Sequence, residues 1–317
     1  MQTFVVDFMV DPSHFDVVLV QGKDSERFLQ GQLTCDVAAL AENKCVRGSC
    51  CNNKGRVIAT FHLVRHQGNF YLCMAHGLGR LLLEALCKYL PFYKCTMTVL
   101  DASQPLSAHA GARARQLCQR MQVNEPAAGQ VVAISSGWLC QLDAAPARVL
   151  LWQNAAIPVQ DAPEQHAHES WEVLDLLQGI YPFRTTDSGL FTPQELHLDR
   201  NDYISFSKGC YTGQEIVARL HYRGKQKRAL FLVTCEQSLA ITAGQQSSVQ
   251  VSGTEFPGKC LLTRSLGSLN LALLELPADF AGIWTSLTVA GTTIQNGCLF
   301  EQKVIQLANL FSFQEAI

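Results

Sequence analysis

Short apolar runs, broken by polar and glycine-rich segments, recur along the chain and predict its strands. Residues 16–20 form a β-branched run, and the segment after it has the pattern of a helix that begins near Asp24 or Ser25 and ends near Gly31. Two longer runs flank residues 52–55, where Asn and Gly accept the positive φ of a tight turn. The order predicts a strand, a short helix and a β-hairpin in succession.

Helical periodicity marks three later segments. Residues 77–90 place leucines on one broad face before Pro91 stops the helix, and residues 109–121 and 169–179 also have the pattern of a helix. The intervening apolar runs are typical of strands, at residues 69–74, 94–101, 130–135, 138–143 and 147–152. Such an order of elements indicates an α+β fold.

After Arg228 the pattern changes to short strand-like runs separated by Gly, Asn and Ser, which favours a small antiparallel β-barrel or sandwich. We therefore expect a mixed αβ region over residues 1–228, with room for two α+β subdomains at about 1–105 and 106–228, and a C-terminal β-barrel over residues 229–317. The boundary falls at a charged motif, and junctions between domains are common ligand sites.

Composition and charge exclude several classes of protein. The 317 residues carry a formal net charge of −2, which argues against a protein that coats nucleic acid through bulk electrostatics. The N-terminal segment is acidic and lacks a long apolar run, and no stretch is apolar enough to span a membrane. We expect a soluble, cytoplasmic protein without membrane contact.

Metal and disulfide chemistry have little support in the sequence. The 13 cysteines are scattered and contain no C-x-x-C pair, so most of them are interpreted as small core residues. His166 and His168 lie in a loop-like stretch without a third ligand at suitable spacing, which predicts exposed histidines rather than metal ligands. The sequence therefore predicts no metal site.

The segment 207–230 combines a cysteine with a possible helix start. Thr212 and Glu215 fit the S/T-x-x-E capping box, which would place Cys210 just before a helix N-terminus and two residues from Lys208. Both features favour a thiolate, so Cys210 is the candidate reactive thiol, with Lys208 as its neighbour in the catalytic role. The alternative, a buried cysteine in a turn, is equally compatible with these local features.

A run of cations ends the same segment. No acidic residue lies between Arg219 and Arg228. The run is either a solvated basic turn or a docking surface for a polyanion, such as RNA phosphates or the glutamate tail of a folate.

The motif also carries a family resemblance, which spans most of residues 15–230. The segments that carry it are "VQGKDSERFLQGQLTCDV", "DSGLFTPQEL", "KGCYTGQEIVAR" and "GKQKRAL". They resemble the YgfZ-type folate-binding proteins, which are relatives of the aminomethyltransferase (T-protein) of glycine cleavage. The resemblance implies binding of tetrahydrofolate or a one-carbon derivative in the N-terminal region, and a role with iron–sulfur client proteins in their assembly or repair and, through them, in tRNA modification.

The resemblance does not extend to the catalytic acids of the T-protein. After the N-x-x-G turn, Ala59 and Thr60 occupy the positions of its acidic pair, and neither is a general base near neutral pH. Aminomethyl transfer by that route is therefore not expected, and Cys210 is the strongest remaining candidate for chemistry beside the folate. Two alternatives stay open: a folate-dependent one-carbon transferase, and a non-catalytic RNA or protein adaptor.

The resemblance also implies the folate contacts. It implies that Phe15 and Trp171 provide the aromatic faces on which folate stacks. Leu177 stands where relatives often have a glutamate, which is a candidate partner for the pterin ring. Either Asp175, Gln178 or another group replaces that glutamate, or folate binds weakly. Further contacts are expected from the motif, at Tyr211, Gly213, Gln214, Glu215, Arg219 and Arg228.

Overall fold

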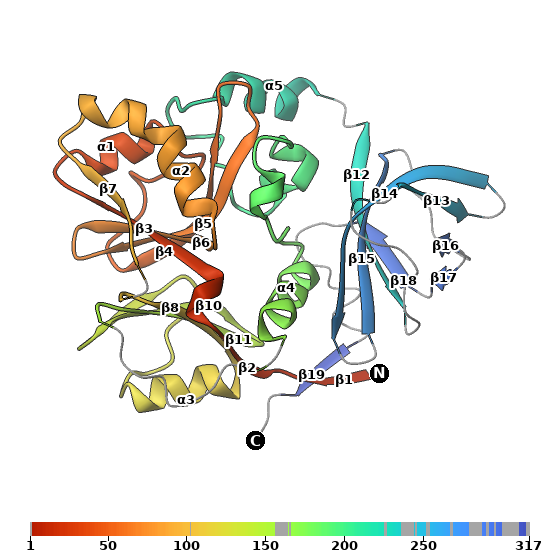
Figure 1. Ribbon diagram of the computed structural model, residues 1–317, viewed down its shortest axis with the longest axis horizontal. Coiled ribbons are helices and arrows are strands. Elements are labelled where there is room, and N and C mark those ends of the chain that lie inside the picture. Colours follow the sequence, from red (N-terminus) through yellow and green to blue (C-terminus); the bar gives the residue numbers. More distant parts are fainter. Residues whose placement is uncertain are drawn as a thin grey trace.

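The structure of the protein is a computed structural model. The structure describes residues 2–101, 103–155, 164, 166–224, 227–235, 244, 246–251, 254–266, 269–278, 287–289, 292–294, 296–299 and 311–314. Within these ranges, two five-stranded sheets, a helical segment and a seven-stranded sheet follow one another (Figure 1).

The first sheet has the strand order β4-β5-β6-β3-β7, and neighbouring strands are antiparallel. Asn52 Oδ1 accepts from the amides of Lys54 and Arg56, and Gly55 has a φ of 67°, so the predicted hairpin turn is confirmed. The elements of this region are β3 (Phe15–Gln21), α1 (Ser25–Gln30), β4 (Lys44–Cys51), β5 (Val57–His66), β6 (Asn69–Ala75), α2 (Leu78–Leu86), η2 (Cys87–Phe92) and β7 (Thr96–Val99).

Helix α2 is shorter than its leucine pattern predicts. It ends at Leu86, and the chain continues as the 3-10 turn η2, which contains Pro91. Proline disfavours the α conformation in the residue before it, so the α-helix cannot extend to the proline. The prediction that residues 77–90 form one helix was therefore wrong at its C-terminal end.

The second sheet has the order β2-β8-β11-β10-β9. Strand β2 pairs with β8, so a segment near the N-terminus belongs to a sheet formed mostly by later residues. The segment 109–121 was predicted as a helix, but His109 and Ala110 lie in β8 and the helix begins at Ala112. The elements are β2 (Asp7–Val10), η1 (Pro12–His14), β8 (Leu106–Gly111), α3 (Ala112–Arg120), β9 (Val131–Ile134), β10 (Gly137–Ala144) and β11 (Ala147–Gln153).

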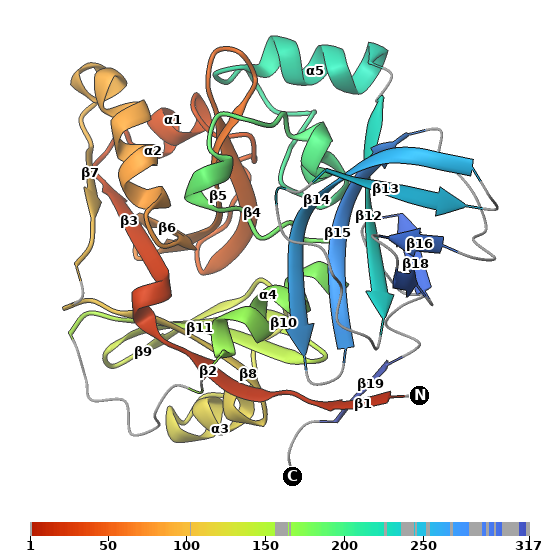
Figure 2. The same ribbon diagram turned by 45° about the vertical axis from the view of Figure 1, so that its right-hand side comes forward.

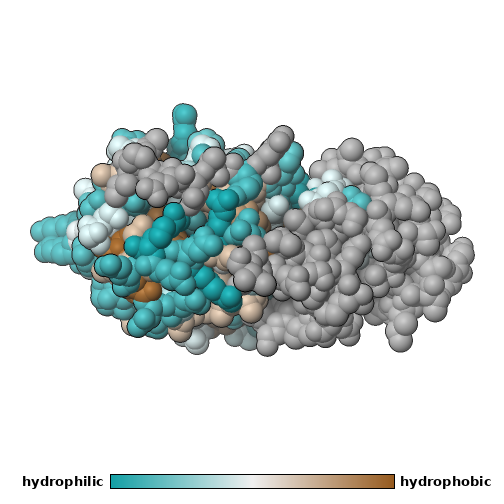
Figure 3. All heavy atoms as spheres, turned by 90° about the horizontal axis from the view of Figure 1, so that it is seen from below, coloured by the Kyte–Doolittle hydropathy of each residue, from teal (hydrophilic) through white to brown (hydrophobic). Residues whose placement is uncertain are grey.

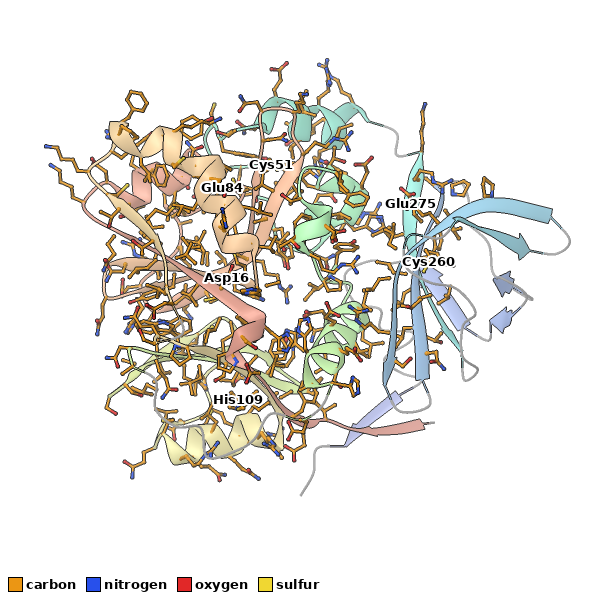
Figure 4. All side chains as sticks on the ribbon, viewed as in Figure 1. Asp16, Cys51, Glu84, His109, Cys260 and Glu275 are labelled. Carbon is orange, nitrogen blue, oxygen red and sulfur yellow. The ribbon has the colours of Figure 1, made fainter. Side chains whose placement is uncertain are left out.

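The two five-stranded sheets enclose a common core. One face of the first sheet and one face of the second contribute to a single buried cluster that includes Val17, Tyr71, Trp138, Leu150 and Trp152. In Figure 4, β3 with Asp16 and β8 with His109 lie on either side of this layer. Burial of large aromatic side chains from both sheets fixes one sheet against the other.

A helical segment connects this pair of sheets to the C-terminal sheet. Helix α4 packs against β14, and residues of both contribute to the buried environment between them (Figures 1 and 2). The elements are α4 (Ala167–Leu177), η3 (Thr185–Asp187), η4 (Gln194–Leu196), η5 (Leu198–Arg200) and α5 (Gln214–Arg223). Helix α5 lies beside the tip of the β4–β5 hairpin in both views.

The C-terminal sheet has the order β17-β16-β13-β14-β15-β12-β18, with antiparallel neighbours. Its strands are β12 (Arg228–Cys235), β13 (Gln246–Val251), β14 (Thr254–Leu266), β15 (Leu269–Pro277), β16 (Leu287–Val289), β17 (Thr292–Ile294) and β18 (Asn296–Leu299). A separate parallel pair joins β1 (Gln2–Val5) to β19 (Phe311–Gln314). The α+β class is confirmed, whereas closure of the C-terminal strands into a barrel stays a prediction.

No helix in the described part of the chain is long and apolar enough to cross a membrane. Figure 3 shows one face of the molecule, on which the described residues are mostly hydrophilic with small hydrophobic areas between them.

Candidate functional site

A cavity of about 90 Å³ lies beside α4, where the helix covers one end of the two facing sheets. Strands β3, β5 and β6 form one wall, and α4 and the chain after it form another. The lining residues are Phe15, Thr60, Phe61, His62, Cys73, Met74, Ala75, Leu106, Leu150, His168, Trp171, Glu172, Asp175, Ile180, Tyr181, Pro182, Phe183 and Tyr203. Apolar and aromatic walls with a few polar groups are typical of cofactor sites.

The fold brings together the two aromatic side chains that the resemblance singled out. Phe15 comes from the start of β3 and Trp171 from the middle of α4, and both line this cavity. The Trp171 ring is buried, and the guanidinium of Arg148 lies 4.8 Å from its centroid. A cation at that distance holds the indole in place and leaves other ring surface for a ligand.

Arg148 is a buried cation that anchors one end of the cavity. Its Nε donates to Asp143 Oδ2 and its Nη1 to Asp175 Oδ1, each at 2.6 Å, and its Nη2 donates to Gln178 Oε1 at 2.8 Å. Burial is the largest single effect on Asp143 and raises its pKa, but the charge and hydrogen bond of Arg148, together with the charge of Arg47 and a hydrogen bond from Gln178, outweigh burial, so the pKa lies below its ordinary value. The hydrogen bond from Arg148 orients the side chain of Asp175, which lines the cavity, and the Gln178 side chain also accepts from Arg148.

His168 and Glu172 form a second polar group at the cavity. The His168 ring stacks on His14 with 4.3 Å between centroids, and Glu172 accepts a hydrogen bond from Arg264 of β14. Burial lowers the pKa of His168. The prediction that His166 and His168 are exposed loop residues holds for His166 and was wrong for His168, because α4 begins at Ala167 and carries His168 inward.

Ala59, Thr60 and Leu177, which stand where the related proteins have acidic residues, lie in different places in the structure. Thr60 lines the cavity, whereas Ala59, on the opposite face of β5, is fully buried in the other core. Leu177 is also buried in that core and is absent from the described lining of the cavity. Of these positions, only Thr60 faces the cavity, and its hydroxyl cannot serve as a carboxylate base.

Several lining residues were missed by sequence reasoning. Tyr203 follows the 3-10 turn η5 and its connecting turn, and burial raises the pKa of Tyr203 to about 12. Arg148 is not among these lining residues but binds one of them, Asp175, and it gave the clearest signal, because it is a lone cation within the apolar run of β11. An unpaired arginine in a buried strand is costly, so its presence there implies acidic partners.

The capping box predicted for α5 is absent. Helix α5 begins at Gln214 after Gly213, which has a φ of 83° and provides no side-chain cap. Thr212 Oγ1 instead donates to Gln32 Oε1 at 2.9 Å. A Cβ on residue 213 would lie 2.5 Å from Asn52 O and 3.2 Å from the Cβ of Cys51, which Figure 4 shows below α5. Glycine is therefore required where the helix start meets the hairpin.

Lys208 and Cys210 have opposite environments. Lys208 is buried, and its Nζ donates to the carbonyls of Gln30, Leu33 and Cys35 at 2.7–2.8 Å. Burial lowers the pKa of Lys208 to about 8, while the three carbonyl contacts favour the ammonium form. Cys210 is exposed. The prediction that Lys208 assists the thiol is not supported by this arrangement, because the ammonium group is held by the α1–β4 connection.

The remaining motif residues lie outside the cavity. The described lining contains none of the predicted motif contacts, which are Lys208, Cys210, Tyr211, Gly213, Gln214, Glu215, Arg219 and Arg228. Tyr211 is buried, with the Lys208 ammonium 5.2 Å from its ring centroid. The fold thus separates the thiol motif from the pair formed by Phe15 and Trp171.

The cation run is divided between two elements. Arg219, His221 and Arg223 are exposed on α5, next to Tyr222, which is 70% exposed. Arg228 begins β12, where its guanidinium donates to the carbonyls of Pro257 and Glu275. Lys225 lies outside the described residues. The exposed α5 side chains, rather than Arg228, are available to a partner.

Comparisons with known proteins identify the class of fold. A family model described as the GCVT N-terminal domain matches residues 7–151. The structure is similar to the glycine cleavage system aminomethyltransferase T from Bartonella henselae, with a TM-score of 0.66 over 95% of this chain and 88% of that chain, at 15% identity. The protein therefore has the aminomethyltransferase T fold.

Two curated relatives define the family more closely. Both are described as tRNA-modifying protein YgfZ. The protein from Colwellia psychrerythraea is 32% identical over 236 residues, which is 72% of this chain and 72% of the relative. The protein from Photobacterium profundum is 29% identical over 280 residues, or 86% of this chain and 84% of the relative. The chain belongs to the YgfZ family.

Proposed function

We propose that this protein binds tetrahydrofolate, or a one-carbon derivative of it, in the cavity beside α4. The observation that carries the proposal is the meeting of Phe15 and Trp171, which come from opposite ends of the αβ region, at one cavity that also contains the Asp175 carboxylate. Flat aromatic faces suit a pterin ring, and a carboxylate suits the amino and ring N–H donors at its edge.

Asp175 is the group that we propose to replace the missing glutamate. One of its oxygens accepts from Arg148, which leaves its second oxygen for two pterin donors. Arg148 then acts as a positioning residue, because it orients both this carboxylate and the Trp171 ring. Leu177 does not oppose this arrangement, since it is buried in the neighbouring core.

The biological role that we propose is accessory rather than T-protein-like catalysis. The protein would support the assembly or repair of iron–sulfur client proteins and, through them, tRNA modification. The family membership and the name of the curated relatives support the tRNA part of this role. Thr60 in place of a cavity-facing acid argues against aminomethyl transfer by the T-protein route.

A one-carbon transferase remains a second candidate because of one specific observation. His168 lines the cavity, and its lowered pKa favours a neutral imidazole that could accept a proton. Turnover of methylene-tetrahydrofolate with an amine acceptor, lost in a His168→Gln variant, would support the transferase. Folate binding without turnover would favour the accessory role.

Folate binding is tested by calorimetric titration of the full chain with tetrahydrofolate kept reduced. Asp175→Asn removes a carboxylate charge that lies in the cavity. Asp143→Asn is the matched control, because Asp143 also binds Arg148 but is not among the described lining residues. We expect Asp175→Asn to weaken binding at least about ten-fold more than Asp143→Asn does, because a charge-assisted hydrogen bond contributes about 1.5–3 kcal/mol.

Two outcomes would contradict the folate proposal. The first is the absence of heat and of tryptophan quenching at high micromolar folate with the unmodified protein. The second is an equal loss of affinity in the two variants, which would indicate that Asp175 acts only through Arg148. Thermal unfolding of both variants controls for the shared loss of an ion pair.

We further propose that α5 and Cys210 form the surface that faces a partner. The exposed cations on α5 surround an exposed tyrosine, a combination that suits RNA phosphates and an unstacked base. The adaptor hypothesis predicts tRNA binding that weakens steeply with salt and survives Cys210→Ala. An Arg219→Ala, Arg223→Ala double variant should have a smaller salt slope, and an unchanged slope would remove RNA as the partner of this helix.

A further inference from the structure

A charged groove of about 390 Å³ lies between the tip of the β4–β5 hairpin, helix α5 and the start of β12. This hairpin groove is lined by Lys54 and Arg56 of the hairpin, Ile216 and Leu220 of α5, and Lys227 and Arg228 at the start of β12. None of its described lining residues also lines the cavity beside α4, so the two are separate sites. The groove lies at the junction with the C-terminal sheet, a common location for ligands.

The walls of the hairpin groove are fixed to one another. A Cβ on Gly55 would lie 2.8 Å from the Cβ of Ile216, so the hairpin tip packs directly on α5. Gln194, which is buried and also lines the groove, donates from Nε2 to Val217 O at 2.8 Å. The 3-10 segment is thereby joined to the same helix. The groove is therefore formed before a ligand arrives, which lowers the cost of binding.

The charge of the groove is strongly positive. Its described lining contains one acid, Glu195, and four cations, which are Lys54, Arg56, Lys227 and Arg228. Glu195 lies 3.0 Å from Arg56 and accepts from the amide and the hydroxyl of Thr192, so its charge is already compensated. The whole chain has a net charge of −2, so the excess of cations is a local feature that favours an anionic ligand.

Three of these cations are available to a ligand. Lys54 and Lys227 are exposed. Arg56 makes its described side-chain contacts through Nη1, and the other N–H donors of its guanidinium remain for an anion. Arg228 differs, because its guanidinium donates to main-chain carbonyls of the C-terminal sheet and forms part of the wall.

The exposed arginines of α5 border the groove. Successive residues of an α-helix are rotated by about 100°, so Arg223, seven positions after Ile216, points within about 20° of the same direction. Arg219 lies three positions after Ile216 and four before Arg223, so it adjoins both. Tyr222 lies three positions after Arg219, on its far side from the groove. The groove, the two arginines and the exposed tyrosine therefore form one continuous surface.

We propose that a single strand of RNA passes from the outer face of α5 into the hairpin groove, with its phosphates on Lys54, Arg56 and Lys227. The proposal rests on the RNA contact that we propose for α5, and it adds the form of the RNA and the groove that receives it. Cationic grooves beside exposed aromatic side chains are typical of proteins that bind single strands. Pockets for small molecules measure about 300–1,000 Å³, so this groove admits one nucleotide of a strand but not a double helix.

The form of the RNA is tested by fluorescence anisotropy with the full chain. The probe is a labelled RNA of mixed sequence and of about 12 nucleotides, which is within the usual site size of about 4–16 nucleotides. The same strand annealed to its complement is the duplex probe. We expect the single strand to bind at least about ten-fold more tightly at equal salt, because a duplex cannot enter the groove. Equal or tighter binding of the duplex would overturn the proposal.

The groove itself is tested by the salt dependence of two double variants. Lys54→Ala, Lys227→Ala removes two exposed cations from the groove, and Lys23→Ala, Lys94→Ala removes two exposed cations outside its described lining. For a single strand, the slope of log K against log salt is about 0.7 per phosphate contact. The slope should therefore become shallower by about 1.4 in the groove variant and stay unchanged in the control.

The Arg219→Ala, Arg223→Ala variant, measured in the same assay, separates this proposal from the α5 surface on which it rests. Shallower slopes in both the α5 variant and the groove variant would support the strand path. A shallower slope in the α5 variant alone would overturn the groove and leave the α5 surface in place. No binding of the single strand by the unmodified protein at low salt would overturn both. Calorimetric titration with tetrahydrofolate tests the cavity beside α4 independently of each of these outcomes.

Discussion

The cavity beside α4 and the motif that begins at Lys208 are organised in opposite ways. The cavity unites Phe15, Thr60 and Trp171, which are far apart in sequence, and its central indole is only 6% exposed. The motif is one continuous segment whose most exposed aromatic, Tyr222, is 70% exposed. The first arrangement suits the enclosed small ligand that we propose, and the second suits the large partner that we propose for the α5 surface.

This difference changes the interpretation of the thiol. A cysteine beside the folate would act on the cofactor, whereas Cys210 is exposed and lies outside the described lining of the cavity. Its exposure puts Cys210 on the surface that we propose faces a partner, away from the proposed folate. Folate binding and thiol chemistry should therefore respond to different mutations, and four experiments follow, ordered by expected effect.

The largest effect is expected from Lys208→Met. The change leaves the carbonyls of Gln30, Leu33 and Cys35 without their common donor in a buried site. We expect the free energy of unfolding to fall by about 2–3 kcal/mol, because buried carbonyls are costly when unpaired. Denaturant titration measures this loss, and Lys54→Met, at an exposed turn, is the control. Unchanged stability would contradict a structural role for Lys208 and would favour the hypothesis that Lys208 assists the Cys210 thiol.

The next effect concerns the aromatic faces. Trp171→Leu should weaken tetrahydrofolate binding by about ten- to hundred-fold, since stacking of a ring on an aromatic side chain contributes about 1–3 kcal/mol. Tyr222→Leu on α5 is the matched control and should leave the folate Kd unchanged. Trp171→Phe should restore most of the affinity. Equal effects of the two leucine variants would erase the distinction between the cavity and the α5 surface.

A smaller effect is expected from pH. Burial lowers the pKa of His168 below its ordinary value of 6.5, so between the two values the unfolded chain binds a proton that the folded protein does not. Stability should therefore fall as the pH decreases from about 6.5, by at most about 1.4 kcal/mol per pH unit for one histidine. Burial also lowers the pKa of His66, so His66 should change the stability in the same direction. His168→Gln should reduce this slope, and His66→Gln added to it should reduce the slope further; an unchanged slope in the double variant would assign the pH dependence to other groups.

Sequence reasoning succeeded where local patterns determine structure. Alternation and turn chemistry predicted the β4–β5 hairpin. The resemblance singled out Phe15 and Trp171, which line one cavity, and their contact with folate stays a prediction. Sequence reasoning failed where the hydrogen-bond partner of a side chain is distant in the sequence. Thr212 donates to Gln32 rather than capping α5, and no local pattern shows this partner, which lies 180 positions away in the sequence.

Burial was the other quantity that local patterns could not supply. Lys208 looked like a neighbour that would activate Cys210, but its ammonium group binds carbonyls of the α1–β4 connection. Arg148 looked like one polar interruption in a strand, yet it determines how Asp175 and Trp171 face the cavity. Both roles depend on tertiary contacts, which adjacent residues in the sequence do not specify.

The smallest effect on binding and stability is expected from Cys210→Ser, and it separates the two regions most directly. The thiol is exposed, so the substitution should change the free energy of unfolding by less than about 0.5 kcal/mol and leave the folate Kd within about two-fold. In cells that lack the native protein, the same variant should fail to restore iron–sulfur enzyme activity. Full restoration would exclude a chemical role for the thiol, whereas a large loss of folate affinity would mean that the α5 motif and the cavity act as one site.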